Sequence, residues 1–162
     1  MNQPYKDYDL YNEHTSNQPK VNAGFRVGLI CGLILGILHI VIAILLSSVF
    51  PLLTSVLWLV KLFIYYMGGR TAAQMQYDSQ RDSLNMLRGV QSAGMGAAMV
   101  TSILSWILIF VGAILGNLSG KVVLFEPISL CISIFLDVLI AIGLGSLGGK
   151  QIADRYKVFQ MD

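Results

Sequence analysis

Charged residues are few in this chain of 162 residues, since they make up only 12% of it. A soluble domain usually carries about a quarter charged residues. The hydrophobic fraction is 55% and the mean hydropathy is +0.67. The shortage of charge argues against an ordinary soluble protein and favours the membrane class.

Sequence patterns for catalysis and cofactor binding are also missing. The chain contains no HExxH, no Cys/His cluster with metal-ligand spacing, no Gly-rich phosphate-binding loop and no nucleophile elbow. Its two cysteines, Cys31 and Cys131, are expected at different membrane depths, which excludes a disulfide within one chain. We therefore expect no enzymatic activity, no cofactor and no metal.

Long apolar runs are what the sequence does contain. Each approaches the roughly 20 residues that cross a hydrocarbon core. The runs are Gly24–Leu46, Pro51–Met67, Gly94–Gly116 and Pro127–Leu147. We expect an all-α integral membrane protein with four transmembrane helices, the first of which acts as an uncleaved insertion signal.

Basic residues indicate the orientation of these helices. If the helices alternate in direction, nine cations fall on one side and Lys121 alone on the other, while Lys61 lies within a span. The nine are Lys6, Lys20, Arg26, Arg70, Arg81, Arg88, Lys150, Arg155 and Lys157. The positive-inside rule then predicts cytoplasmic N and C termini in an inner or plasma membrane. These cations are expected to set topology and not to bind nucleic acid.

The chain divides into a tail and two similar halves. Residues 1–22 are a polar, flexible cytoplasmic tail, unless the tyrosines at 5, 8 and 11 order it on a partner protein. Residues 23–90 form a two-span hairpin with a cytoplasmic helical extension. Residues 91–162 form a second hairpin with a short cytoplasmic tail.

The two halves end in similar segments. The second run ends in MGGRTAAQMQY (67–77) and the fourth in LGGKQIADRY (147–156). We interpret them as two parallel two-helix repeats related by an axis along the membrane normal, with the first and third spans near it. Chance convergence of two helix ends is the alternative.

Small residues at a spacing of four predict close helix packing, because such residues share one helix face. The first run carries the most regular set, with side-chain-free positions on every turn. The predicted packing residues are Gly24, Gly28, Gly32, Gly36, Gly94, Ala98, Ser102, Gly112, Gly116, Ser133, Ala141, Gly145 and Gly149.

Three ionisable residues, His39, Lys61 and Asp137, lie inside the predicted spans. Lys61 and Asp137 both follow a span-opening proline by ten residues, so they share a depth. An interhelical ion pair, a Lys61 that reaches the interface, and a relay through Asp137 and His39 all remain open. His39 as a pigment or haem ligand is a further alternative.

Aromatic residues in the spans suggest simpler roles. Tyr65 and Tyr66 are predicted at the cytoplasmic interface. Trp58 and Trp106 are predicted as packing residues.

Two functions are consistent with these features. The first is a structural or accessory subunit of a membrane protein complex, which packs through its glycine faces against other subunits or a second copy. The second is a small oligomeric transporter or ion or proton channel that uses Asp137 with Lys61 or His39. The partners expected are the lipid bilayer and either other membrane protein subunits or a second copy of this chain.

Overall fold

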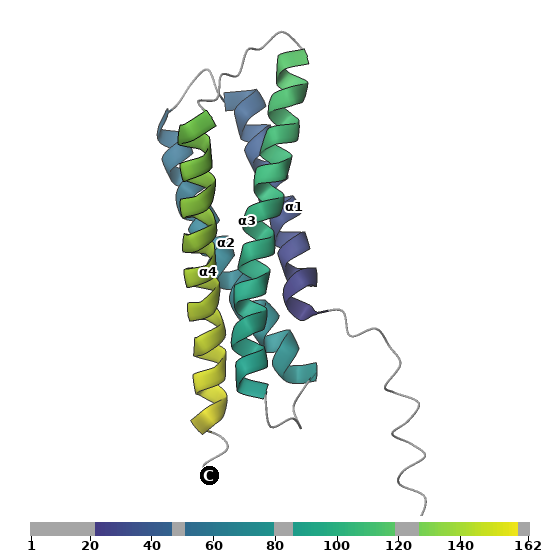
Figure 1. Cartoon of the computed structure of the whole chain (residues 1–162), viewed down its shortest axis with the longest axis vertical. Coiled ribbons are helices and arrows are strands. Elements are labelled where there is room, and N and C mark those ends of the chain that lie inside the picture. The colour runs from purple at the N-terminus through teal and green to yellow at the C-terminus, as the bar shows by residue number, and fades with distance from the viewer. Residues whose placement is uncertain (1–21, 47–50, 80–85, 119–126, 159–162) are drawn as a thin grey trace, which may run out of the picture.

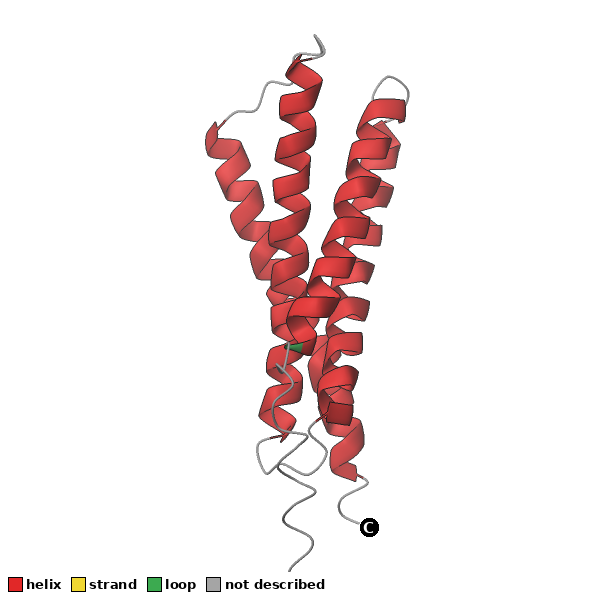
Figure 2. Ribbon diagram, turned by 90° about the vertical axis from the view of Figure 1, so that its right-hand side faces the viewer, coloured by secondary structure: helices red, strands yellow, loops and turns green. Residues whose placement is uncertain are grey.

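The computed structural model describes residues 22–46, 51–79, 86–118 and 127–158. Within these ranges, the side chains at 43–46, 51–55, 86–87, 116–118, 127 and 157–158 are not described. The described chain forms helices α1 (Ala23–Leu46), α2 (Pro51–Ser79), α3 (Met86–Leu118) and α4 (Pro127–Val158). The all-helical prediction is confirmed, and Figure 2 shows no strand among the described residues.

The helix starts follow from local chemistry. The Asn22 side-chain Oδ1 accepts a hydrogen bond from the Gly24 amide at 3.0 Å and caps α1. Pro51 and Pro127 open α2 and α4, where the missing proline N–H costs nothing. The helices α2, α3 and α4 all continue beyond the apolar runs at the lower end of the bundle (Figure 1).

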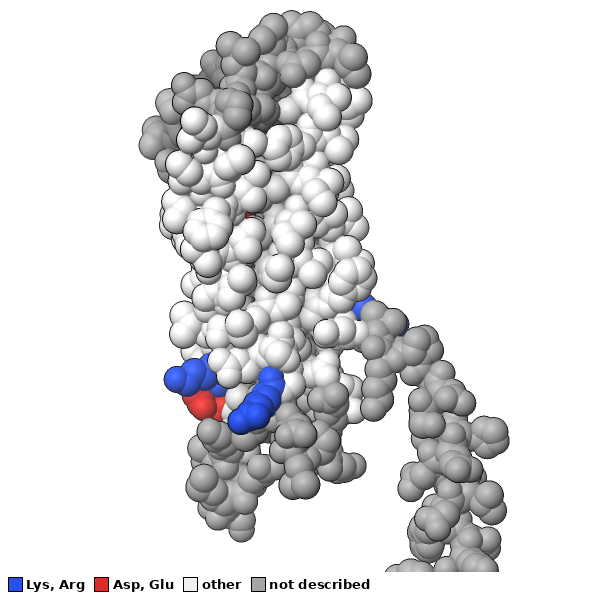
Figure 3. Space-filling view, viewed as in Figure 1, with Lys and Arg blue, Asp and Glu red and all other residues white. Residues whose placement is uncertain are grey.

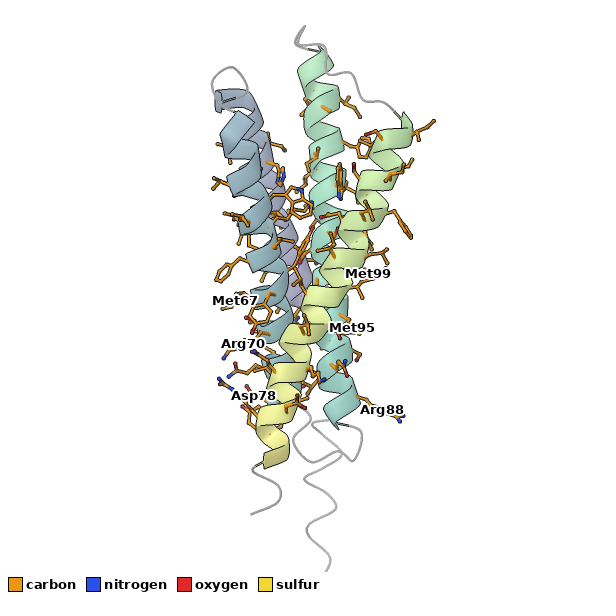
Figure 4. All side chains as sticks on the ribbon, turned by 90° about the vertical axis from the view of Figure 1, so that its left-hand side faces the viewer. Met67, Arg70, Asp78, Arg88, Met95 and Met99 are labelled. Atoms are coloured by element: carbon orange, nitrogen blue, oxygen red, sulfur yellow. The ribbon has the colours of Figure 1, made fainter. Side chains whose placement is uncertain are left out.

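The helices alternate in direction, so α1 runs parallel to α3 and α2 runs parallel to α4. Both α2 and α3 contact all other helices, whereas α1 and α4 do not contact each other within the described residues. In Figures 2 and 4, the hairpins α1–α2 and α3–α4 lie close together at the lower end and diverge toward the upper end.

The predicted two-fold repeat is only partly reflected in this packing. A two-fold axis would make the α1–α4 and α2–α3 pairs equivalent, yet only α2 and α3 pack together. The helices that contact all others are α2 and α3, while the first and third helices, expected near the axis, also pack closely together. The repeat itself remains a prediction.

The distribution of side chains is the reverse of that in a soluble protein. A central cluster takes one residue from each helix, and two of the four are alanines: Leu35, Tyr65, Ala98 and Ala141. Large apolar side chains face outward instead, for example Ile30 at 60%, Leu59 at 67% and Phe135 at 64% exposure. Such a surface suits lipid, in which small interior residues let helices approach closely.

Among the described residues, three helices contain segments long and apolar enough to cross a membrane, namely Ala23–Ile42, Arg88–Leu115 and Ile128–Tyr156. This finding is consistent with a membrane protein. The part of α2 with described side chains, residues 56–79, is not among them.

Charged side chains gather at the lower end of the molecule (Figure 3). Above them the visible face is almost entirely uncharged. Figure 4 shows the same change along the bundle axis, with Met67 and Met95 above Arg70, Asp78 and Arg88.

Candidate functional site

A buried ion pair joins the two hairpins inside the bundle, about one third of the way along α2 and α4 from their first residues. The ammonium Nζ of Lys61 on α2 lies 2.6 Å from Oδ2 of Asp137 on α4. The two residues are only 4% and 3% exposed. Of the alternatives for Lys61, the structure has the interhelical pair and not a side chain extended to the interface.

Three further donors converge on the same carboxylate oxygen. The Tyr65 hydroxyl, the Ser102 hydroxyl and the Trp106 indole N–H each donate to Asp137 Oδ2 at 2.8 Å. Hydrogen bonds to an ionised acceptor are roughly twice as strong as neutral ones. Together with Lys61, these donors replace the water that a carboxylate loses inside a membrane.

Aromatic rings also surround the cation. The Lys61 Nζ lies 5.1 Å from the centroid of the Trp106 ring and 5.8 Å from that of Tyr65. A ring face within about 6 Å attracts a cation. Lys61 therefore has one anionic partner, Asp137, and two aromatic partners, Tyr65 and Trp106. We call Lys61, Asp137, Tyr65, Trp106 and Ser102 the polar cluster.

The cluster draws from both halves of the chain. Lys61 and Tyr65 come from the first hairpin, and Ser102, Trp106 and Asp137 come from the second. The cation and the carboxylate therefore satisfy each other only when the hairpins associate. Ser105 extends the polar stripe on α3 and donates its hydroxyl to the Ser102 carbonyl at 2.8 Å.

His39 is engaged with its own helix. Its ring nitrogen Nδ1 lies 3.0 Å from the Leu35 carbonyl oxygen, one turn earlier on α1. The structure thus brings Lys61 and Asp137 together, whereas the hydrogen bond of His39 goes to the backbone of α1. Within the described residues, no group of His, Cys, Asp or Glu side chains is arranged to hold a metal ion.

Glycines on three helices set the helix spacing below the polar cluster. A Cβ built on Gly69 would lie 2.6 Å from the Cα of Gly145, and one on Gly94 would lie 2.6 Å from the Gly145 carbonyl oxygen. Real Cβ atoms do not approach backbone so closely. The backbones of α2, α3 and α4 therefore meet here without intervening side chains.

The glycine groove of α1 is filled by α3. A Cβ added to each of these glycines would collide with successive α3 residues: Gly24 with Ala93, Gly28 with Ala97 and Val100, Gly32 with Leu104, and Gly36 with Leu108. The closest α3 atoms include the carbonyl oxygens of Ala93 and Ala97 at the lower glycines, whereas they belong to the Leu104 and Leu108 side chains toward the end where the hairpins diverge. The Thr101 hydroxyl also reaches the Gly28 carbonyl at 3.2 Å.

The remaining predicted packing residues occupy varied surroundings. Ala98, Ala141 and Gly149 are buried, and Gly112 is half-buried opposite Ile40. Gly116 is among the residues whose side-chain surroundings the structure does not describe. Ser133 does not pack within the described bundle, since it is exposed and its hydroxyl donates to the Ser129 carbonyl of its own helix at 2.8 Å.

Two members of the polar cluster were not expected from the sequence. Tyr65 is fully buried and not at the interface, which corrects its predicted place. Trp106, predicted as a packing residue, is half-buried and donates its indole N–H to Asp137. The available signal was spacing: Tyr65 lies one helical turn from Lys61, and Ser102 lies one turn from Trp106.

Comparisons with known proteins give no relative for this chain. No protein-family model, curated protein or solved structure matches it.

Proposed function

We propose that this protein is a structural or accessory subunit of a membrane protein complex. The proposal rests on the contacts of Asp137. Its Oδ2 forms the ion pair with Lys61 and accepts hydrogen bonds from three further side chains. A carboxylate held in this way suits a fixed link between helices better than a group that binds and releases a proton or ion.

The outer surface supplies the second support. Gly143 on α4 is exposed, and a Cβ built on it would meet no atom within 4 Å. The flanking residues Leu139 and Leu147 are 49% and 57% exposed and lie one turn away on either side. A small residue between two large ones offers a notch for a side chain of another transmembrane helix.

In this proposal all four helices span the membrane, including α2. Tyr77 near the end of α2 stacks on Tyr156 near the end of α4, with ring centroids 3.6 Å apart. Since α2 and α4 run side by side in one direction, α2 crosses wherever α4 crosses. The lower end, with its basic side chains, faces the cytoplasm.

The test is the composition of the complex extracted in a gentle detergent. The tagged chain should migrate on a native gel above its own 17.8 kDa monomer plus micelle, together with other subunits or a second copy. Gly143→Leu should fill the notch and reduce this assembly, whereas Ser133→Leu, at an exposed site of the same helix, should not. Gly32 is unsuitable for this test because it faces Leu104 inside the protomer.

A monomer at every detergent concentration would overturn the proposal. So would ion or proton flux in liposomes that Asp137→Asn abolishes while the fold is retained. That second outcome would favour the transporter or channel expected as the alternative.

A further inference from the structure

The described basic side chains at the lower end of the bundle form no ion pairs. Within the described ranges, the one ion pair is that of Lys61 with Asp137. The remaining described cations come from all four helices, and the described acids at this end are Asp78 and Asp154. The cations are Arg26, Arg70, Arg88, Lys150 and Arg155.

Two of these cations occupy equivalent places in the repeated segments. Arg70 follows Met67-Gly68-Gly69, and Lys150 follows Leu147-Gly148-Gly149. All four glycines are buried at helix contacts. Met67 and Leu147 are 38% and 57% exposed. Each lies one helical turn from its cation, on the side of the exposed apolar surface above the charged end, which we call the apolar belt.

Helix register places the two cations at nearly the same height. A Cβ built on Gly148 would lie 2.9 Å from the backbone N of Arg70, so Arg70 is level with Gly148. Lys150 lies two residues further along α4, or about 3 Å at 1.5 Å per residue. We call Arg70 and Lys150 the basic rim.

We propose that the basic rim binds the phosphate of anionic phospholipids in the surrounding leaflet. The exposed Met67 and Leu147 contact the first part of the acyl chains, and the cation one turn below contacts the headgroup. Cations beside an apolar surface match the two ends of such a lipid in charge and in polarity. The inference depends on insertion in a membrane and not on the accessory role.

Arg88 and Arg155 provide a matched control pair. The residue one helical turn from Arg88 toward the apolar belt is Gln91, which is polar and exposed. The corresponding residue for Arg155 is Ile152, which is only 3% exposed. Neither has an exposed apolar neighbour at that position. The loss of two cations here changes the net charge as much as their loss at the rim.

The experiment measures lipid binding to the purified full chain in a neutral detergent by native mass spectrometry. We expect dioleoylphosphatidylglycerol to bind more tightly than dioleoylphosphatidylcholine. The Arg70→Gln/Lys150→Gln variant should weaken phosphatidylglycerol binding by roughly 30-fold, from about 1 kcal/mol for each cation. Arg88→Gln/Arg155→Gln should stay within about twofold of the wild type.

Three results would overturn the inference: equal binding of the two lipids, an equal loss in both double variants, or displacement of the lipid by matched inorganic phosphate. The first would exclude charge recognition, the second a local site, and the third a lipid ligand. Arg70→Lys/Lys150→Arg keeps both charges and should retain binding, which separates charge from folding. A monomeric protein that still binds the lipid would refute only the accessory role.

Discussion

At the scale of single residues, the Lys61–Asp137 pair should dominate the stability of the interior. Asp137→Asn keeps an acceptor for Tyr65, Ser102 and Trp106 but leaves the Lys61 ammonium buried without its counter-ion. We expect the free energy of unfolding to fall by about 3 kcal/mol, since removal of one partner strands the other charge. Circular dichroism during titration with a denaturing detergent measures this loss.

The double variant Lys61→Met/Asp137→Asn is the control for that measurement. Because it removes both charges, it should recover most of the lost stability. If Asp137→Asn alone were as stable as the wild type, the pair would not hold the hairpins together.

Gly145 and Gly143 allow a second prediction on one helix. A Cβ at Gly145 would lie 2.5 Å from the Gly94 carbonyl oxygen, so Gly145→Ala must separate α3 from α4. We expect a loss of about 1–3 kcal/mol in the same titration, the usual cost of overpacking. Gly143→Ala meets no atom and should be neutral or slightly stabilising. Equal effects at both sites would contradict the glycine contact.

Residue spacing predicted the depth of a side chain along the bundle better than the direction in which that side chain points. Equal counts from Pro51 and Pro127 placed Lys61 and Asp137 at one level, as the structure has them. The side toward which Tyr65 or Ser133 points depends on the rotation of each helix about its axis. Neighbouring helices fix that rotation, and a single sequence does not contain their positions.

At the scale of helices, the lower ends of α2, α3 and α4 form a small bundle of their own. Ala73, Val90, Ile152 and Ala153 are buried together there, beside the stacked rings of Tyr77 and Tyr156. The repeated segments suggested a tyrosine at both helix ends, but not that the two rings would meet. The apolar runs ended before these extensions, although the sequence predicted a helical extension after the second run.

Tyr156→Ala should loosen this lower bundle selectively. The loss of an aromatic pair costs about 1 kcal/mol, and the burial of the ring is lost as well. Hydrogen exchange should therefore quicken at the amides of 72–79 and 150–156, while those around Asp137 stay protected. Tyr156→Phe retains the ring and should exchange like the wild type. Uniform acceleration along all four helices would contradict an independent lower bundle.

At the scale of the whole molecule, the distribution of apolar and charged side chains is the feature on which the proposed orientation rests. The small, polar interior and large apolar exterior suit lipid, and the cations collect where that exterior ends (Figure 3). The sequence predicted this arrangement from composition and from the alternation of apolar runs. It did not predict that α1 and α4 would stay apart, because their separation arises from how α2 and α3 pack between them.

Single cysteines in a Cys31→Ala/Cys131→Ala background test this orientation. Asp78→Cys and Asp154→Cys, at the lower ends of α2 and α4, should react with a membrane-impermeant maleimide only after the cells are permeabilised. Ile128→Cys, at the upper end of α4 where the side chain is 77% exposed, should react in intact cells. Because positive charges are retained on the cytoplasmic side, the opposite labelling would reverse the topology. Labelling of Asp78→Cys together with Ile128→Cys in intact cells would show that α2 does not cross the membrane.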